Sequence, residues 1–268
     1  MSELTFVHLS DTHIGPKGRL QYGTDTAAKL RQAAQHIETM ALAPICVIIS
    51  GDLSDHGELE SYQHIHAVLA ESFGPFGVPV LLTLGNHDLR LPFRHVFLHD
   101  MSTTDEALPW YYSRELHGIR FIMLDSKLPG EIHGELDAPQ LAWLETELQQ
   151  PAPIGHIVVV HHPSVPRGVP RPDDYLLANR EDFGHILRRY PSVLGVLCGH
   201  SHVSTAAAFG GTLHVAAPAT AYLFDPSLRQ GSRGLDGCGF NICTVREGRL
   251  IVNPVILPGE QRELYHRA

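Results

Sequence analysis

The chain has 268 residues, of which 43% are hydrophobic and 18% are charged, a composition that excludes a disordered protein. This length accommodates one large core, and we expect a single domain spanning residues 1–268. The formal net charge of -9 excludes a broad cationic surface, so we do not expect the protein to bind a nucleic acid polymer.

Short apolar segments alternate with amphipathic segments before residue 200. Because the apolar segments are short, nearly continuous and rich in Val and Ile, they predict strands buried on both faces. The predicted strands are residues 5–10, 45–50, 78–84, 119–125, 157–161 and 193–198. The predicted helices are residues 24–40, 58–71 and 137–149, with another ending at 187–191. In the third helix Asp137 is the expected N-cap, and Pro139 lies in the first turn.

After residue 202 the pattern changes to strands joined by short turns. These strands are predicted at residues 203–209, 213–217, 240–245 and 250–256. We expect the chemical motifs to lie within residues 5–202 and an antiparallel extension to occupy residues 203–257. Together the elements predict an α/β fold in which helices flank two packed sheets. The proline-rich residues 163–172 are expected to form an ordered loop over a site.

The first residues lack the basic segment and cleavage site of a signal peptide, and no apolar run approaches the roughly 20 residues of a membrane span. The four cysteines form neither a zinc knuckle nor a CxxC redox pair. We therefore expect a cytoplasmic protein that does not bind a membrane. The cysteines are Cys46, Cys198, Cys238 and Cys243.

Five predicted strands end directly before residue types that bind metal ions. Ligands of open α/β sheets gather at the carboxyl ends of the strands. In chain order, these ends carry Asp11-Thr12-His13, Gly51-Asp52, Gly85-Asn86-His87-Asp88, His161-His162 and Gly199-His200-Ser201-His202. Asp, Asn and Gly are also ordinary turn residues, so one such motif alone is weak evidence. Five in succession predict a metal centre.

The spacing of these residues suggests how they meet. In an extended chain, residues i and i+2 point to the same side, so Asp11 and His13 are expected to reach one ion together. The glycines at positions 51, 85 and 199 remove side-chain bulk where the backbone turns beside the cavity. Carboxylate, amide and imidazole ligands suit zinc, iron or manganese better than calcium. Seven such side chains exceed the needs of one ion and fit two ions that share Asp52.

These motifs resemble those of the calcineurin-like metallophosphoesterase superfamily, from the first strand to about residue 202. More narrowly, the chain resembles bacterial class III cyclic nucleotide phosphodiesterases and the related glycerophosphodiesterases. The narrower resemblance extends to residues 20–23, 124–126, 130–143 and 231–240. It implies a four-layer αββα sandwich with two mixed β-sheets, and a homodimer.

The resemblance also implies the roles of individual residues. It assigns the first metal ion to Asp11, His13, Asp52 and His202. It assigns the second ion to Asp52, Asn86, His161 and His200, with Asp52 bridging the two. Asn86 and His87 are implied substrate contacts, and His87 is the candidate general acid because an imidazole titrates near neutrality. Iron and manganese are the expected ions, with zinc as an alternative.

The implied activity is hydrolysis of a small phosphodiester, most simply of 3′,5′-cAMP to the nucleoside 5′-monophosphate by in-line attack of a metal-bound hydroxide. A glycerophosphodiesterase or a broad-specificity phosphodiesterase uses the same metal chemistry, so the motifs do not separate these activities. A non-catalytic metal-binding scaffold is a further alternative, against which the full ligand set argues. A protein phosphatase is a fourth, less favoured because the chain is compact.

Several neighbouring residues have two possible roles. His87 could only orient Asn86, and His162 could replace His161 as a ligand. We expect Asp88 to hydrogen-bond within its own loop. His133 lies in a loop that could reach the site, and Tyr22 could stack on a nucleobase, although packing within its own loop is favoured.

Overall fold

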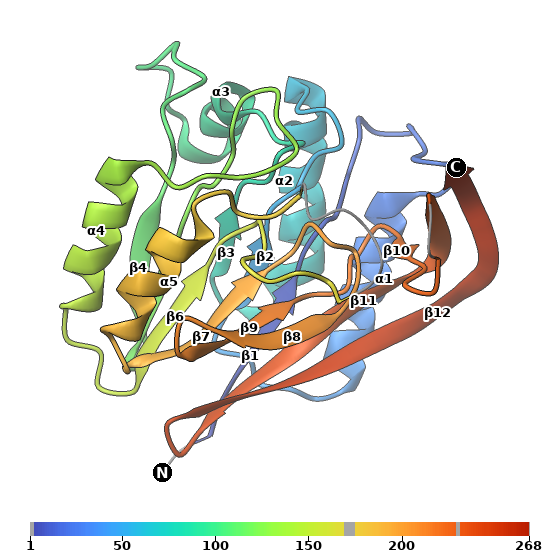
Figure 1. Ribbon diagram of the computed structural model, residues 1–268. Helices are drawn as coiled ribbons and strands as arrows, with labels where there is room; N and C mark the ends of the chain where they lie inside the picture. The colour runs from blue at the N-terminus through green and yellow to red at the C-terminus, as the bar shows by residue number, and fades with distance from the viewer. Residues whose placement is uncertain (1–2, 169–174, 229–230, 268) are drawn as a thin grey trace.

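The computed structural model describes residues 3–168, 175–228 and 231–267, in which two six-stranded β-sheets are packed between helices (Figure 1). The first sheet has the order β10 (Leu223–Phe224), β11 (Ser232–Arg246), β1 (Leu4–Leu9), β2 (Val47–Ser50) and β3 (Val80–Thr83), with β12 (Arg249–Arg267) also paired to β11. The second sheet has the order β4 (Tyr112–Leu116), β5 (Ile119–Met123), β6 (Gly155–Val159), β7 (Val193–Cys198), β9 (Thr212–Ala216) and β8 (Thr205–Phe209). Both sheets contain parallel and antiparallel pairs, which confirms two mixed sheets.

Alternate residues of the central strands face different parts of the core. In β1, Phe6 faces the second sheet and lies 5.3 Å, between ring centroids, from Phe121 of β5. Its neighbour Val7 faces the opposite way and packs with residues of α1 (Thr26–Thr39) and α2 (Leu59–Phe73). Burial on both faces explains why the strands are continuously apolar in the sequence.

The helices form the two outer layers. The helices α1 and α2 cover the first sheet, whereas α4 (Ala138–Leu148) and α5 (Arg180–Arg188) cover the second, on the opposite side of the molecule (Figure 1). The Asp137 carboxylate accepts a hydrogen bond of 2.8 Å from the backbone N of Gln140, which confirms it as the N-cap of α4. The short helices η1 (Gly74–Phe76), α3 (Arg90–Phe93) and η2 (Arg94–Leu98) lie in the connections. The αββα sandwich is therefore confirmed.

The C-terminal strands are longer and more central than their sequence pattern indicated. β11 pairs antiparallel with β1, and β9 pairs parallel with β7, so these strands extend both sheets. β11 and β12 form a long antiparallel hairpin whose last residues approach α1 and β10 (Figure 1). Residues 232–239 contain polar residues and glycines, so their sequence pattern does not predict a strand. Pairing with the neighbouring strands stabilises the strand conformation despite this low propensity. The single-domain interpretation stays a prediction.

No helix within the described ranges is long and apolar enough to cross a membrane. Of the proline-rich segment expected over the site, residues 163–168 are described, and residues 169–172 lie outside the described residues.

Candidate active site

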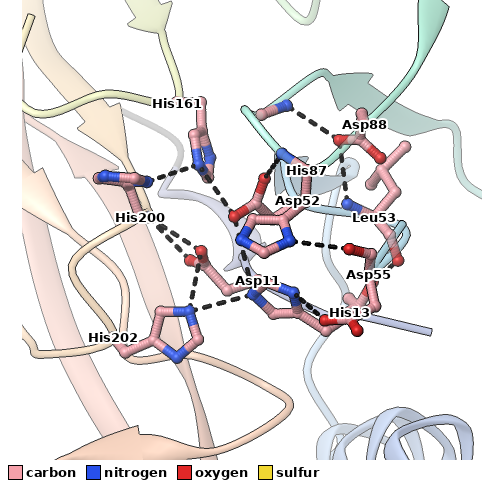
Figure 2. A network of polar contacts seen from close by, with 12 residues as sticks. Asp11, His13, Asp52, Leu53, Asp55, His87, Asp88, His161, His200 and His202 are labelled. Atoms are coloured by element: carbon pink, nitrogen blue, oxygen red, sulfur yellow. Dashed lines mark hydrogen bonds and ion pairs between the residues drawn. The ribbon is translucent and has the colours of Figure 1, made fainter. Parts of the chain in front are cut away.

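The predicted metal-binding side chains meet at the carboxyl ends of β1, β2, β3, β6 and β7, where they form one buried cluster (Figure 2). The centre of this cluster is Asp52. Its Oδ2 atom lies 3.3 Å from Nε2 of His161 and 3.6 Å from Nε2 of His13. One carboxylate oxygen therefore lies between the two halves of the cluster, as a bridging ligand must.

Each half of the cluster brings together residues that are far apart in the sequence. In the first half, Nε2 of His202 lies 3.4 Å from Oδ1 of Asp11 and 3.1 Å from Nε2 of His13. In the second half, Nε2 of His161 lies 3.2 Å from Nδ1 of His200. The backbone N of His200 also donates to the Asp11 carboxylate at 2.9 Å, which ties the two halves together.

The outward-facing ring nitrogens show which atoms carry lone pairs toward the centre. Nδ1 of His202 donates to the Tyr222 carbonyl oxygen at 2.9 Å, and Nδ1 of His13 donates to the Asp55 carboxylate at 3.1 Å. A neutral imidazole has only one N–H, so both Nε2 atoms then carry lone pairs that face each other. A cation beside them removes this repulsion. The donor set therefore fits a metal ion held by oriented histidines.

The half of the cluster that contains His161 and Asn86 also presents atoms that can bind a cation. Nδ1 of His161 donates to the Ser50 carbonyl oxygen at 2.7 Å, so Nε2 is the ring nitrogen that faces Asp52. Burial lowers the pKa of His161, but the charge of Asp52 outweighs it and raises that pKa to about 9, so a bound cation would take the place of the Nε2 proton. The Oδ1 atom of Asn86 is buried and has no hydrogen-bond partner among the described residues. Because a buried amide oxygen without a partner is costly, this atom is suited to bind a cation. Asn86 lines the same cavity as Asp52 and His200, and its place in the second ligand set stays a prediction.

The histidines of the cluster favour the ionised form of the Asp52 carboxylate. Burial alone would raise the pKa of the Asp52 carboxyl, but the His161 and His87 rings beside it lower that pKa well below its ordinary value. Asp52 is therefore an ionised carboxylate at neutral pH, the form that binds cations.

The backbone of the predicted ligands is not extended, which corrects the reason given for their convergence. Asp11 and His13 have φ angles of 54° and 43°, and Asp52 has a φ of 48°. His200 and His202 also have positive φ angles, of 66° and 53°. Left-handed backbone is uncommon for residues other than glycine, and such strain gathers at functional sites. Tight turns after the strands, and not an i, i+2 alternation, bring these side chains together.

Three glycines leave the space that these side chains occupy. A Cβ atom on Gly51 would lie 2.5 Å from Nδ1 of His161, and one on Gly199 would lie 2.7 Å from Oδ2 of Asp11. A Cβ atom on Gly85 would lie 2.5 Å from the backbone N of Asp52 and 2.7 Å from Nε2 of His161. Each glycine therefore permits the close approach expected from its place beside a metal-binding motif.

We expect Gly85→Ala to lower the free energy of unfolding by about 1–3 kcal/mol, because the added methyl group overpacks the cluster. It should also reduce the metal content and the hydrolytic activity, since Asp52 must move. Thermal unfolding and metal analysis measure these effects. Gly74→Ala is the matched control, because a Cβ atom there meets nothing within 4 Å. Equal unfolding temperatures for the two variants would contradict the steric argument.

Asp88 organises the loop that carries Asn86 and His87. Its carboxylate accepts hydrogen bonds from the backbone N atoms of Gly85, Ser54 and Leu53, at 2.9, 3.0 and 3.1 Å (Figure 2). It also accepts one of 3.0 Å from the Tyr62 hydroxyl. Asp88 thus bonds within its own loop, as expected, and in addition holds that loop against the loop of Asp52.

A buried ion pair supports the same loop from the other side. Nε and Nη2 of Arg90 donate to the Asp125 carboxylate at 2.7 and 3.0 Å, and both side chains are almost fully buried. Arg90 also donates to the carbonyl oxygen of Lys127, whose ammonium group donates to the Asn86 carbonyl oxygen at 3.2 Å. Asp125 and Lys127 therefore help to hold the loop that carries Asn86 in place.

His87 lines the cavity and also lies against the cluster, with its ring centroid 4.7 Å from that of His13. Its Nδ1 donates to the Asp55 carbonyl oxygen at 2.8 Å, which leaves Nε2 for a substrate. Its backbone N donates to Oδ1 of Asp52 at 2.9 Å. Desolvation disfavours the charged ring, but the negative charge of Asp52 and the bond to Asp55 outweigh it and raise the pKa of His87. The ring is thus placed as a proton donor should be, and its raised pKa favours the protonated form.

His162 and His133 are distinguished by their contacts. Nδ1 of His162 lies 2.7 Å from the Ser126 hydroxyl, and Nε2 lies 3.1 Å from the Ile132 carbonyl oxygen. Both nitrogens of this buried ring therefore have protein partners, which favours His161 as the ligand. His133 pairs with Glu131 at 3.7 Å and does not line the cavity beside the cluster.

A cavity of about 300 Å³ opens beside the cluster, and sequence reasoning missed most of its outer wall. This wall includes Arg167, Tyr175, Tyr222, Phe224, Tyr265 and Arg267. These residues come from distant segments, and neither their spacing nor a motif indicated that they meet. Tyr22 also lines the cavity, so it does more than pack its own loop. Asp55, which orients His13, was missed although it lies three residues after Asp52.

The family model of the calcineurin-like phosphoesterases matches residues 4–204, which contain all five motifs. The chain belongs to the calcineurin-like phosphoesterase family. Members of this family depend on two metal ions, and the family comprises hydrolases of phosphate esters.

Relatives within the calcineurin-like phosphoesterases carry more specific names. The chain is 35% identical to a probable cyclic nucleotide phosphodiesterase of Rhodococcus erythropolis, covering 94% of this chain and 83% of the relative. It is 32% identical to a cAMP/cGMP dual specificity phosphodiesterase of Mycobacterium tuberculosis, covering 96% and 80%. It is also 32% identical to a probable glycerophosphodiester phosphodiesterase of Arcobacter nitrofigilis, covering 74% and 72%. These names match the family resemblance of the motifs.

A solved structure shares the fold of this calcineurin-like phosphoesterase. A dimetal phosphatase from Danio rerio superposes with a TM-score of 0.61 at 16% identity, covering 93% of this chain and 98% of that one. This likeness supports the fold alone.

Proposed function

We propose that this protein is a two-metal phosphodiesterase that hydrolyses 3′,5′-cyclic nucleotides to nucleoside 5′-monophosphates. The observation that carries the proposal is the cluster of carboxylate oxygens and imidazole Nε2 atoms around Asp52, which lies beside a cavity that His87 also lines. Two relatives that match nearly the whole chain, at 35% and 32% identity, are named for cyclic nucleotides, and these names favour a cyclic nucleotide as the substrate.

Two ligand sets are proposed within the cluster. One ion would be held by Asp11, His13, Asp52 and His202. The other would be held by Asp52, Asn86, His161 and His200. When bound, the two ions polarise the phosphoryl oxygens and lower the pKa of water. Iron with manganese suits this mixed oxygen and imidazole set, and zinc is compatible with it.

The protein residues position the substrate and move a proton. Asn86 and His87 lie at the floor of the cavity, where a phosphodiester would contact both. Hydrolysis of a 3′,5′-cyclic phosphate breaks the bond between phosphorus and O3′, and this oxygen must take up a proton. His87 Nε2 is proposed to donate it, since Nδ1 is held by Asp55 and the ring favours its protonated form. A covalent intermediate with the protein is not needed.

A glycerophosphodiester is the second candidate substrate, because a relative of similar identity bears that name. Cytoplasmic location is proposed as well, and all four cysteines are buried free thiols, as suits a reducing compartment. A homodimer is also proposed, on the family resemblance alone.

Removal of metal tests the proposed function directly. We expect chelation to abolish hydrolysis of 3′,5′-cAMP and added Mn²⁺ to restore it, with adenosine 5′-monophosphate as the product. Chromatography identifies the product, and glycerophosphocholine is assayed in parallel. If added Mn²⁺ restored hydrolysis of glycerophosphocholine and not of 3′,5′-cAMP, a glycerophosphodiester would become the proposed substrate. Failure to hydrolyse either diester after reconstitution would overturn the proposal.

A further inference from the structure

The outer wall of the cavity is built from aromatic rings. The Tyr222 and Phe224 rings lie against His202, with centroids 4.5 and 4.7 Å from the imidazole centroid. The Tyr22 and Tyr265 rings contact each other at 4.6 Å and extend this wall away from the metal cluster. If a phosphodiester binds at the metal cluster, a planar group attached to it and extending along this wall contacts mainly aromatic rings.

The outer part of this wall comes from the end of the chain. Tyr265 and Arg267 lie on β12, whose Arg267 pairs in register with Ser232 of β11. Nη2 of Arg267 donates to the Tyr22 hydroxyl at 3.3 Å, and its guanidinium lies 5.3 Å from the Tyr265 ring centroid. The last strand thus closes one side of a cavity whose floor comes from β1, β2, β3 and β7.

A second arginine lies on the same cavity. The guanidinium of Arg167 stacks 3.7 Å from the Tyr175 ring centroid, and its Nε is buried with no hydrogen-bond partner among the described residues. Two guanidinium groups therefore border a cavity whose outer wall is mainly aromatic, with Ile132 and Ser232 also lining it. This combination attracts anions and flat, electron-rich groups.

The two arginines favour a nucleobase over a quaternary ammonium group as the part of the substrate that contacts the aromatic wall. Aromatic walls bind both nucleobases and quaternary ammonium groups such as choline. A choline group in the cavity would meet the like charges of Arg167 and Arg267, which disfavours it. An uncharged nucleobase meets no such penalty, and it stacks on aromatic rings and on guanidinium planes. A glycerol group has no planar face to offer.

Resting on the proposed function, we propose that Tyr22, Tyr265 and Arg267 form a nucleobase subsite that selects cyclic nucleotides over choline- and glycerol-bearing diesters. The phosphodiester lies at the metal cluster, and the base stacks against the paired tyrosine rings. Tyr22 is 40% exposed, so a ring face is available to it. The C-terminal strand is then a determinant of specificity, outside the motifs that carry the chemistry.

The test compares substrates that differ only in the base. We expect the wild-type protein to hydrolyse 3′,5′-cAMP with a kcat/KM at least about tenfold above that of methyl riboside 3′,5′-cyclic phosphate, which lacks a base. Tyr265→Leu and Tyr22→Leu should each reduce this ratio severalfold, mainly by raising KM for cAMP. Their activity on the baseless diester should change less than about twofold, since stacking is the interaction removed. That substrate also reports whether each variant folds and binds metal.

Tyr111→Leu is the matched control, because Tyr111 is also half-buried but packs on Trp143, away from the cavity. Arg267→Gln should raise activity on glycerophosphocholine relative to cAMP, because it removes a like charge. An unchanged cAMP preference in both tyrosine variants overturns the subsite. Binding of adenosine 5′-monophosphate and ribose 5-phosphate, measured by calorimetry, tests the subsite even if no diester is hydrolysed. The hydrolysis assays therefore test the proposed function, and the comparison of substrates and ligands with and without a base tests the subsite separately.

Discussion

Replacement of Asp52 by Asn is expected to lower kcat/KM for 3′,5′-cAMP by at least about 10³-fold. Oδ2 of Asp52 lies between Nε2 of His161 and Nε2 of His13, so one substitution alters both proposed ion sites. The amide keeps the shape of the side chain but removes the negative charge. Asn is preferred to Ala because it tolerates the positive φ of this position.

Metal content separates this explanation from a general loss of structure. Inductively coupled plasma mass spectrometry should find fewer bound ions per chain in the Asp52→Asn protein, while its circular dichroism spectrum is unchanged. Asp182→Asn, an exposed carboxylate on α5, is the matched control and should retain full activity and metal. Full metal occupancy together with full activity in Asp52→Asn would rule out a bridging role.

Replacement of His87 by Ala is expected to reduce kcat on 3′,5′-cAMP by about 10²–10⁴-fold, the usual contribution of a general acid. The loss should depend on the leaving group. Bis(p-nitrophenyl) phosphate releases a stable phenolate that needs no proton, so its hydrolysis should fall by less than about tenfold. Steady-state kinetics on both substrates measures the difference.

Contacts of His87 predict that its removal leaves the metal centre intact. The hydrogen bond to Asp52 comes from the backbone N of residue 87, which alanine retains. Metal content should therefore equal that of the wild-type protein. Equal losses on the cyclic and the activated diester would instead indicate that His87 binds the phosphate and donates no proton.

The part of the fold that carries the chemistry was predictable because its signals are local. Strands such as β2 and β7 are mostly apolar since both faces are buried, and ligands gather at the carboxyl ends of such parallel strands. The Asp, Asn and His residues that follow these strands could therefore be grouped before any contact was known. Helix α4 was equally clear, because Asp137 and Pro139 mark its first turn.

The end of the chain was less predictable, for a physical reason. β11 contains glycines and charged residues between 232 and 239, and its strand conformation depends on pairing with β1, β10 and β12. The local pattern therefore indicated only residues 240–245. The same pairing brings Arg267 beside Ser232 and Tyr22, so the cavity wall was missed together with the strand.

Residue types and their order along the chain, with the family resemblance of the motifs, were enough to indicate a two-metal phosphoesterase, because ligands gather at the carboxyl ends of parallel strands. The packing of the two sheets decided that the ends of β1, β2 and β3 meet those of β6 and β7. Folding alone established the left-handed turns at Asp11, His13 and Asp52, which aim these side chains. It also supplied the partners that orient the histidines, such as the Tyr222 carbonyl oxygen for His202. These features depend on contacts between distant segments, and such contacts leave no period or spacing in a single sequence.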